Sequence, residues 1–147
     1  MQIRPAVPGD AQDIHELVQR AYAHYVERIG RRPGPMDEDY AEKVARNLVS
    51  VAGEAGDIVG LIVLIREPRS LLVENVAVAP ERQGEGIGAA LLAFAEATAR
   101  EAGTPTLRLY THAAMTENLA LYPRLGYEQT DRRTDNGFER VFFVKHL

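Results

Sequence analysis

Three glycines at alternate positions, Gly84, Gly86 and Gly88, lie between a run typical of a β-strand and a run typical of an α-helix. Because glycine has no Cβ atom, such a segment lets backbone N–H groups face a common point and lets an anion approach them closely. A helix that begins directly after the glycines adds unpaired N–H groups and a partial positive charge. The pattern therefore predicts a binding site for phosphate or pyrophosphate that needs no lysine.

Two general phosphate-binding motifs fit this segment poorly. A Walker A loop continues from its second glycine into Gly-Lys-Ser/Thr, whereas Gly88 is followed by Ala89. The dinucleotide fingerprint G-x-G-x-x-G/A is matched formally by Gly84, Gly86 and Ala89, and such short matches often arise by chance. The fingerprint should open a βαβ unit and be followed about 20 residues later by an acidic residue. Residues 107–109 read Leu-Arg-Leu and contain no acid.

The elements that must position this loop are predicted from hydrophobic periodicity and from turn residues. Four helices are expected: one capped by Asp10, one capped by Asp37, one that follows Gly88, and one over residues 116–125. The pair Asn136-Gly137 indicates a two-residue type I′ hairpin turn. Strands are expected at residues 2–6, 48–52, 58–65, 71–78, 106–111, 127–132 and 138–144.

The element order is thus β-α-α-β-β-β-α-β-α-β-β, which predicts an α/β fold of the α+β kind. Its front half is antiparallel, with a turn at residues 53–57 joining two strands as a hairpin. This order differs from the strict βαβα alternation of a doubly wound sheet. No repeat or linker interrupts the chain, so we expect a single domain over residues 1–147.

Two motifs resemble those of a known family. Residues 83–88, Gln-Gly-Glu-Gly-Ile-Gly, resemble the Arg/Gln-x-x-Gly-x-Gly/Ala signature of the Gcn5-related N-acetyltransferases, the GNAT family, and residues 76–80 resemble the strand and turn that precede it. Residues 121–127, Leu-Tyr-Pro-Arg-Leu-Gly-Tyr, resemble the family's second motif, Leu-Tyr-x-Lys/Arg-x-Gly-Phe/Tyr. The resemblance implies the GNAT acyl-CoA N-acyltransferase fold, a mixed and mostly antiparallel central sheet of about six to seven strands flanked by about four helices.

The resemblance also implies acetyl-CoA as co-substrate, without a metal, and a loop that holds the coenzyme pyrophosphate. The family usually carries an Asn seven residues before the tyrosine of its second motif, and this chain has Met115 there. Asn118 either contacts the coenzyme arm from the next helical turn or hydrogen-bonds within the helix start. The other expected coenzyme-binding residues are Val76, Ala77, Val78, Gln83, Gly84, Glu85, Gly86, Ile87, Gly88, Ala89 and Tyr122.

Acyl transfer to an amine needs a group that accepts the amine proton, donors for the oxyanion and an acid for the departing thiolate. Glu74 is the candidate base, directly or through a water molecule; alternatively it is an edge carboxylate paired with an arginine. By resemblance, the backbone N–H of Val78 stabilises the oxyanion and Tyr122 protonates the thiolate, although Tyr122 can also be a packing residue. Direct transfer in a ternary complex is expected, and the chain has no cysteine for a thiol intermediate.

The acceptor side is expected in the first two helices and the loop between them, as is usual in the family. Arginines there can bind a carboxylate, and acids can attract a polyamine or a lysine side chain. The alternative is a solvated loop with its tyrosines in the core. Amino acids, peptide N-termini, lysine side chains, aminoglycosides and polyamines all remain open as small-molecule or peptide acceptors. The candidate acceptor-binding residues are Tyr25, Arg28, Met36, Tyr40 and Tyr110.

Three other activities remain open at this stage. The chain can transfer another short acyl group, transfer to a hydroxyl, or act as a non-catalytic acyl-CoA sensor that retains the loop and lacks the chemistry.

The composition argues against several classes of protein. The 147 residues carry a net charge of -4, which argues against nucleic-acid and anionic-membrane binding. The absence of cysteine excludes disulfides, thiolate catalysis and Cys-ligated zinc, and the histidines are too scattered for a metal site. The first residues lack a signal-peptide pattern, and no apolar run approaches the roughly 20 residues that cross a bilayer. We expect a cytoplasmic protein; dimers are common in the family.

Overall fold

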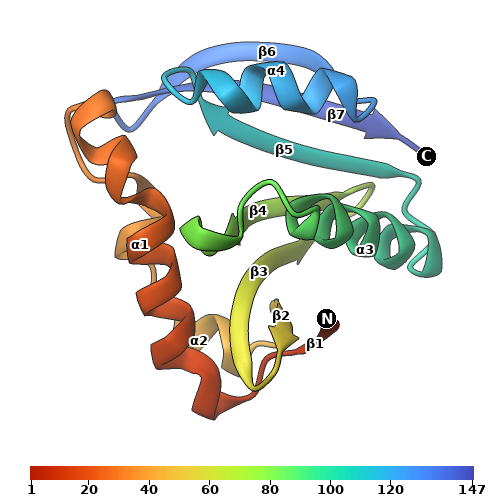
Figure 1. The fold of residues 1–147 in the computed structure, drawn as a ribbon. Coiled ribbons are helices and arrows are strands. Elements are labelled where there is room, and N and C mark those ends of the chain that lie inside the picture. Colours follow the sequence, from red (N-terminus) through yellow and green to blue (C-terminus); the bar gives the residue numbers. More distant parts are fainter. The chain divides into compact units, whose positions relative to one another are not determined.

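The structure is a computed structural model that describes residues 1–147, and it contains seven strands and four α-helices (Figure 1). The helices are α1 (Ala11–Ile29), α2 (Tyr40–Ala45), α3 (Ile87–Glu101) and α4 (Thr116–Arg124). The strands are β1 (Gln2–Pro5), β2 (Val49–Glu54), β3 (Asp57–Arg66), β4 (Leu71–Val78), β5 (Thr106–His112), β6 (Glu128–Asp135) and β7 (Phe138–His146).

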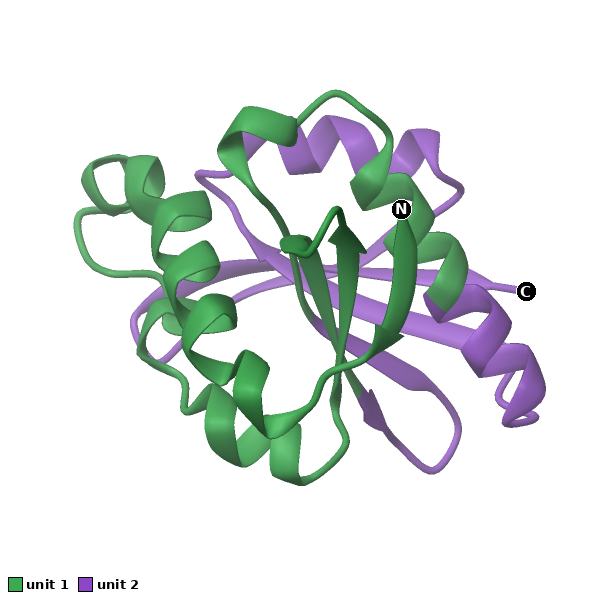
Figure 2. Ribbon diagram, turned by 60° about the horizontal axis from the view of Figure 1, so that its bottom comes forward, with its two compact units in different colours: residues 1–64, 75–94 green, residues 65–74, 95–147 purple.

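The strands are hydrogen-bonded in the order β1-β2-β3-β4-β5-β7-β6. β4 and β5 are parallel, whereas β1–β2, β2–β3, β5–β7 and β6–β7 are antiparallel. The predicted fold class is therefore confirmed. The chain also divides into two compact units (Figure 2), of which unit 1 comprises residues 1–64 and 75–94, and unit 2 comprises residues 65–74 and 95–147.

The core of unit 1 forms where one face of α1 and of α2 packs on strands. On α1, buried residues at spacings of three and four include Ile14, Leu17, Val18 and Ala21, as an amphipathic helix requires. They belong to one apolar cluster with Tyr40 and Val44 of α2 and with Val51, Leu61 and Val63 of β2 and β3. Burial of each large aliphatic side chain contributes about 1.5–3 kcal/mol.

Close packing inside unit 1 depends on Gly60 in the middle of β3. A Cβ atom at this position would lie 3.0 Å from Cγ2 of Ile87, 3.1 Å from Cδ1 of Leu91 and 3.2 Å from the carbonyl oxygen of Ala77. The start of α3 therefore lies against the backbone of β3, in the place of the missing side chain. The signal in the sequence was a lone glycine within an otherwise β-branched run.

Unit 2 is built on β5, which pairs with the first residues of β4 on one side and with β7 on the other. Leu71 aligns with Leu107 and Val73 with Leu109 in the parallel pair. The β6–β7 hairpin closes through Asn136 and Gly137, whose φ angles of 52° and 80° are the positive values that a type I′ turn needs. This predicted turn is confirmed.

Three local predictions were wrong. Asp10 directly precedes α1, but its side chain caps no N–H of that helix and instead accepts hydrogen bonds from Arg4 and from the N–H of Val7. Asp37 does not cap α2: it lies in a short 3₁₀ turn and pairs with Arg32, while Asp39, directly before the helix, accepts a hydrogen bond from the N–H of Glu42 at 3.1 Å. A cap must directly precede the first helical residue, which Asp37 does not. The turn expected at residues 53–57 contains only Ala55 and Gly56, both with positive φ, because the paired strands extend to meet it.

No helix of the structure has both the length and the apolar character that crossing a membrane requires.

Candidate active site

Two of the three glycines of the loop need the conformational freedom of glycine, whereas α3 begins at Ile87, one residue before the third rather than after it. Gly84 and Gly86 have φ angles of 83° and 87°, in the left-handed region that residues with a Cβ atom rarely adopt. A Cβ atom at either position would meet no atom within 4 Å, so the requirement for glycine is conformational and the space beside the loop is open. Gly88 differs, because it lies inside α3 and a Cβ there would be 3.7 Å from Cγ2 of Val78, an ordinary contact.

Unpaired backbone donors follow these glycines at the start of α3. The first backbone bond of the helix runs from the N–H of Ala90 to the carbonyl of Gly86. The N–H groups of residues 86–89 donate to no other group of the chain. Such groups, at the positive end of a 15-residue helix, favour an anion. The local sequence thus builds a cradle of backbone donors that can bind a phosphate group.

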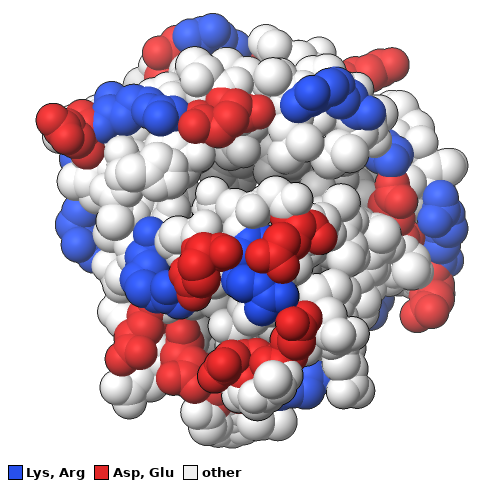
Figure 3. Space-filling view, in the orientation of Figure 1, with Lys and Arg blue, Asp and Glu red and all other residues white.

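Ion pairs hold the segment that leads into this cradle. Arg82 donates to Glu85 at 2.9 Å and to Glu54 of β2 at 3.0 Å, and these bonds raise the pKa of its guanidinium. Arg20 of α1 likewise binds Glu81 at 2.8 Å. Because Arg82 pairs with Glu85, the carboxylate directly before residues 86–89 repels an incoming anion less. Acidic and basic side chains are interspersed over the face shown in Figure 3.

The second half of β4 presents its residues alternately to the core and away from it. Asn75 and Ala77 are buried, while Glu74, Val76 and Val78 are half-buried. By this alternation, Glu74, Val76 and Val78 share one face of the strand. The side-chain amide of Gln83 lies 3.5 Å from the carbonyl oxygen of Val78, which links the loop to the end of the strand.

The predicted acceptor residues of unit 1 are mostly buried. Tyr25 lies beneath Arg28, whose guanidinium carbon is 5.1 Å from the ring centre. Met36 is buried, and its carbonyl accepts a hydrogen bond from Gln19 of α1 at 2.7 Å. Tyr40 is buried and its hydroxyl donates to the carbonyl of Pro35 at 2.6 Å. A role for them in acceptor binding stays a prediction.

Asn75 anchors this region, and the sequence interpretation missed it. Its Oδ1 accepts a hydrogen bond from the Tyr22 hydroxyl at 2.5 Å, and its Nδ2 donates to the Tyr40 hydroxyl at 3.1 Å. With the bond from Tyr40 to Pro35, this forms a continuous chain from α1 through β4 to the loop before α2. The available signal was a single amide inside an otherwise apolar strand.

In unit 2, the predicted acid Tyr122 is a buried residue of α4. Its ring centre lies 5.6 Å from that of Tyr127 and 5.6 Å from that of Phe143. The packing role weighed for Tyr122 is therefore present, and an acid role stays a prediction. The hydroxyl of Tyr127 is buried without a hydrogen-bond partner, and burial raises its pKa.

Asn118 is held from one end only. Its Nδ2 donates to Oγ1 of Thr111 at 3.1 Å and lies 3.7 Å from the sulfur of Met115, while its Oδ1 has no partner in the chain. Met115, which occupies the position of the family's asparagine, is buried and also accepts the hydroxyl of Thr111 at 3.4 Å. Asn118 therefore hydrogen-bonds locally and keeps one acceptor atom available.

Tyr110, the remaining predicted acceptor residue, lies on β5 beneath Arg140 of β7, whose guanidinium carbon is 4.6 Å from the ring centre. Arg140 and the neighbouring His112 were not identified as acceptor-binding residues from the sequence. No group of three or more His, Asp or Glu side chains is arranged to hold a metal ion.

The chain matches the model of the acetyltransferase (GNAT) domain over residues 45–129. It is 35% identical over 91 residues to a mycothiol acetyltransferase of Jonesia denitrificans, a match of 60% of this chain and 29% of that protein. A mycothiol acetyltransferase of Pseudarthrobacter chlorophenolicus is 32% identical over 142 residues, 89% of this chain and 43% of that protein. The crystal structure of a PaiA N-acetyltransferase from Thermoplasma acidophilum, in complex with coenzyme A, has a TM-score of 0.84 at 20% identity and covers 99% of this chain and 98% of that one.

The chain thus spans less than half of the length of these two curated relatives. The solved structure shows the same fold. Because the family model covers more than half of the 147 residues and matches both motif regions, the chain belongs to the GNAT acetyltransferase family.

Proposed function

We propose that this chain transfers an acetyl group from acetyl-CoA to a primary amine by direct attack in a ternary complex. One observation carries the proposal: the N–H groups of residues 86–89 make no hydrogen bond in the chain and follow two left-handed glycines at the start of α3. These donors suit the pyrophosphate of coenzyme A. Asn118 Oδ1 is available to accept an amide N–H of the coenzyme arm.

The chemistry uses three further groups. A free alkylammonium has a pKa of about 10.4, so Glu74, directly or through a water molecule, accepts the amine proton. The amine nitrogen then forms a bond with the thioester carbonyl carbon, and the backbone N–H of Val78 stabilises the oxyanion. As the carbon–sulfur bond breaks, the hydroxyl of Tyr122 gives its proton to the thiolate, and the extra proton that the attacking nitrogen carries is released and restores the tyrosine hydroxyl. Membership of the family and the motif positions of Val78 and Tyr122 support their roles. Glu74 lies outside the motifs, and its role is supported by its half-buried position on β4, the strand that also carries Val78.

The two curated relatives are both named mycothiol acetyltransferases, so the substrates of those enzymes belong in an acceptor panel. Amino acids, peptides, aminoglycosides and polyamines complete it. Calorimetry with coenzyme A and acetyl-CoA, followed by a thiol-release assay over this panel, tests the proposal. We expect binding of both coenzymes and thiol release with at least one amine. Binding without any release would indicate an acyl-CoA sensor, and release with hydroxyl acceptors alone would indicate an O-acyltransferase.

The variant Gly86→Ala tests the loop, with Gly103→Ala as a matched control. Both glycines have positive φ, 87° and 73°, and in both places a Cβ atom would meet open space. Each substitution should lower the free energy of unfolding by about 1–2 kcal/mol, because an L-residue is strained there. Only Gly86→Ala should also weaken coenzyme A binding in calorimetry. Equal affinities of the two variants would contradict the cradle.

A further inference from the structure

One face of unit 2 carries aromatic and basic side chains from β5 and β7. Tyr110 pairs directly with Phe142, and His112 with Arg140, so each pair points to the same side of the sheet. The guanidinium carbon of Arg140 lies 4.6 Å from the ring centre of Tyr110 and 5.8 Å from that of Phe138. The ring of Phe138 meets His112 edge-on at 6.0 Å. Arg140 thus lies over aromatic rings that restrict its orientation.

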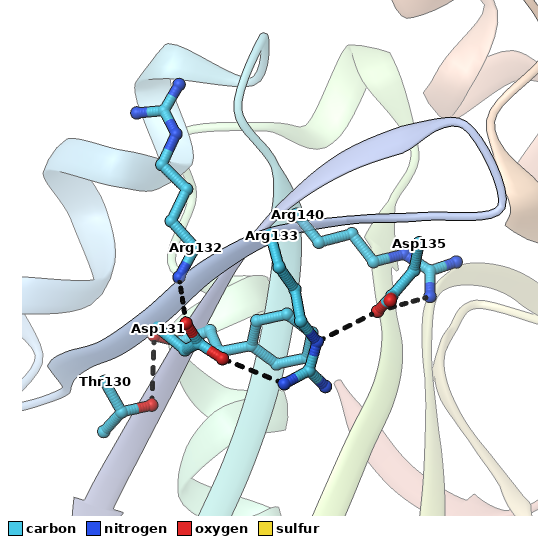
Figure 4. A network of polar contacts seen from close by, with 7 residues as sticks. Thr130, Asp131, Arg132, Arg133, Asp135 and Arg140 are labelled. Atoms are coloured by element: carbon cyan, nitrogen blue, oxygen red, sulfur yellow. Dashed lines mark hydrogen bonds and ion pairs between the residues drawn. The ribbon is translucent and has the colours of Figure 1, made fainter.

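Arg140 differs from the other arginines of the β6–β7 hairpin in its hydrogen bonds. Arg133 donates to Asp131 at 2.9 Å and to Asp135 at 3.3 Å, and Arg132 donates to Glu139 at 2.8 Å. Figure 4 shows Arg133 between its two carboxylates, with Arg140 reaching Asp135 from β7. The ion pair between Arg140 and Asp135 is 3.8 Å long, which is beyond hydrogen-bond distance. The guanidinium of Arg140 forms no hydrogen bond within the chain.

The burial of Arg140 makes this lack of hydrogen bonds informative. Its side chain is 23% exposed, against 52% for Arg132 and 54% for Arg133, so water reaches it less. A guanidinium has five N–H donors in a planar fork that matches a carboxylate. A partly buried fork that has one ion pair at 3.8 Å and no hydrogen bond is suited to a second anion, which comes from outside the chain.

His112 supplies a further donor beside Arg140. Its Nδ1 accepts a hydrogen bond from the backbone N–H of Ala114 at 2.9 Å, so the neutral ring carries its proton on Nε2. Burial lowers the pKa of His112 and the charge of Arg140 lowers it further, against the opposing effect of Glu139. At neutral pH the ring therefore donates through Nε2 and adds no charge.

We propose that Arg140, with His112 beside it, binds a carboxylate of the amine acceptor, and that the apolar part next to this carboxylate lies against Tyr110 and Phe138. The acceptor class is then an amine that carries a carboxylate near an apolar group, such as an apolar amino acid. This inference rests on the proposed acetyl transfer, and it selects among the acceptor classes left open there. The bond between Arg140 and the carboxylate is charge-assisted, and aromatic rings hold the guanidinium in position.

Kinetics with matched acceptors test the inference. L-phenylalanine and its carboxamide share the amine and the ring and differ in the charged group. Wild type should prefer the acid in kcat/KM by about 10- to 100-fold, the range expected for a hydrogen bond to a charged group. Arg140→Gln should remove the preference, and Arg140→Lys should restore only part of it because lysine lacks the fork. Arg132→Gln, with the same charge change at an exposed pair of the same hairpin, should keep it.

A binding measurement works even if no acceptor of the panel turns over. In NMR titrations, N-acetyl-L-phenylalanine should bind wild type about 10- to 100-fold more tightly than its carboxamide does, which is the contribution of one charge-assisted bond. The variant Arg140→Gln should bind the two compounds with equal affinity. Equal binding of both compounds to wild type would overturn the subsite and leave acetyl transfer intact. A loss of coenzyme A affinity in Arg140→Gln would also overturn it, because Arg140 would then serve a coenzyme phosphate. Absence of thiol release with all amines would instead contradict the proposed function.

The variant His112→Asn tests the Nε2 donor and keeps an acceptor for the backbone N–H of Ala114. Asparagine can still accept the N–H of Ala114, but it lacks the Nε2 donor. We expect a fall of about 3- to 10-fold in the preference for the acid, about that of one neutral hydrogen bond, with unchanged thermal stability. An unchanged preference would remove His112 from the subsite.

Discussion

The glycine loop of unit 1 and the β6–β7 hairpin of unit 2 present hydrogen-bond donors in opposite ways. In the loop, the donors are backbone N–H groups, and side chains are small or turned to ion-pair partners such as Arg82 with Glu85. On the hairpin, the donors are guanidinium groups, and most are already paired. Recognition by backbone depends on local conformation, whereas recognition by side chains depends on which neighbours the strand register supplies.

The largest expected effect comes from a single side-chain atom. Tyr122→Phe removes the proposed acid, so kcat should fall on the order of 100-fold, while coenzyme affinity stays unchanged because the loop is intact. Thiol release and calorimetry check the two quantities. An unchanged kcat would mean that Tyr122 only packs against Phe143 and that acetyl transfer needs no acid at this position.

The variant Gly88→Ala tests the glycine loop, because it should change thermal stability and coenzyme A affinity in opposite directions. The new Cβ makes an ordinary contact at 3.7 Å with Val78, and alanine is preferred to glycine in a helix by about 1 kcal/mol. Thermal stability should therefore rise. Coenzyme A affinity should fall about tenfold, because a methyl group lies beside the unpaired N–H groups. A variant that is more stable and binds equally well would show that the coenzyme does not approach residue 88.

Arg108 of β5 forms the carboxylate hydrogen bonds that Arg140 of β7 lacks. Arg108 donates to Glu67 at 2.7 and 3.0 Å, and these bonds lower the pKa of the carboxyl. A lowered pKa stabilises the fold above the unfolded value of 4.5 and ceases to do so as pH falls through the folded value. Arg108→Gln should cost about 1 kcal/mol at pH 7, since the pair is partly exposed. Denaturant titrations should show this difference shrinking below pH 4.5; a constant difference would point to lost packing.

The smallest effect has the opposite sign. Tyr127→Phe removes a buried hydroxyl that has no partner, so the free energy of unfolding should rise by up to about 1 kcal/mol and Tm by roughly 3 °C. Differential scanning calorimetry checks this. A loss of stability would mean that the hydroxyl has a water-mediated partner.

Features with local causes were predictable from the sequence. Gly84, Gly86 and the Asn136-Gly137 turn have positive φ angles, which these residue types announce directly. The amphipathic pattern of α1 likewise gave its buried face. The element order followed from these local signals, and the family followed from two motifs.

Features that depend on pairing were not predictable. Asn75 meets Tyr22 and Tyr40 only because α1 and α2 pack on the same side of β4. The alignment of His112 with Arg140 is set by the register of β5 against β7. The same register leaves the guanidinium of Arg140 without a carboxylate within hydrogen-bond distance.

The side chain of Asn75 couples the local unfolding of two segments of unit 1. One amide group both accepts from Tyr22 and donates to Tyr40, so releasing either tyrosine leaves a buried polar atom unsatisfied. Local fluctuations of α1 and of the segment before α2 are therefore thermodynamically linked, and their protection against solvent exchange should be lost together rather than separately.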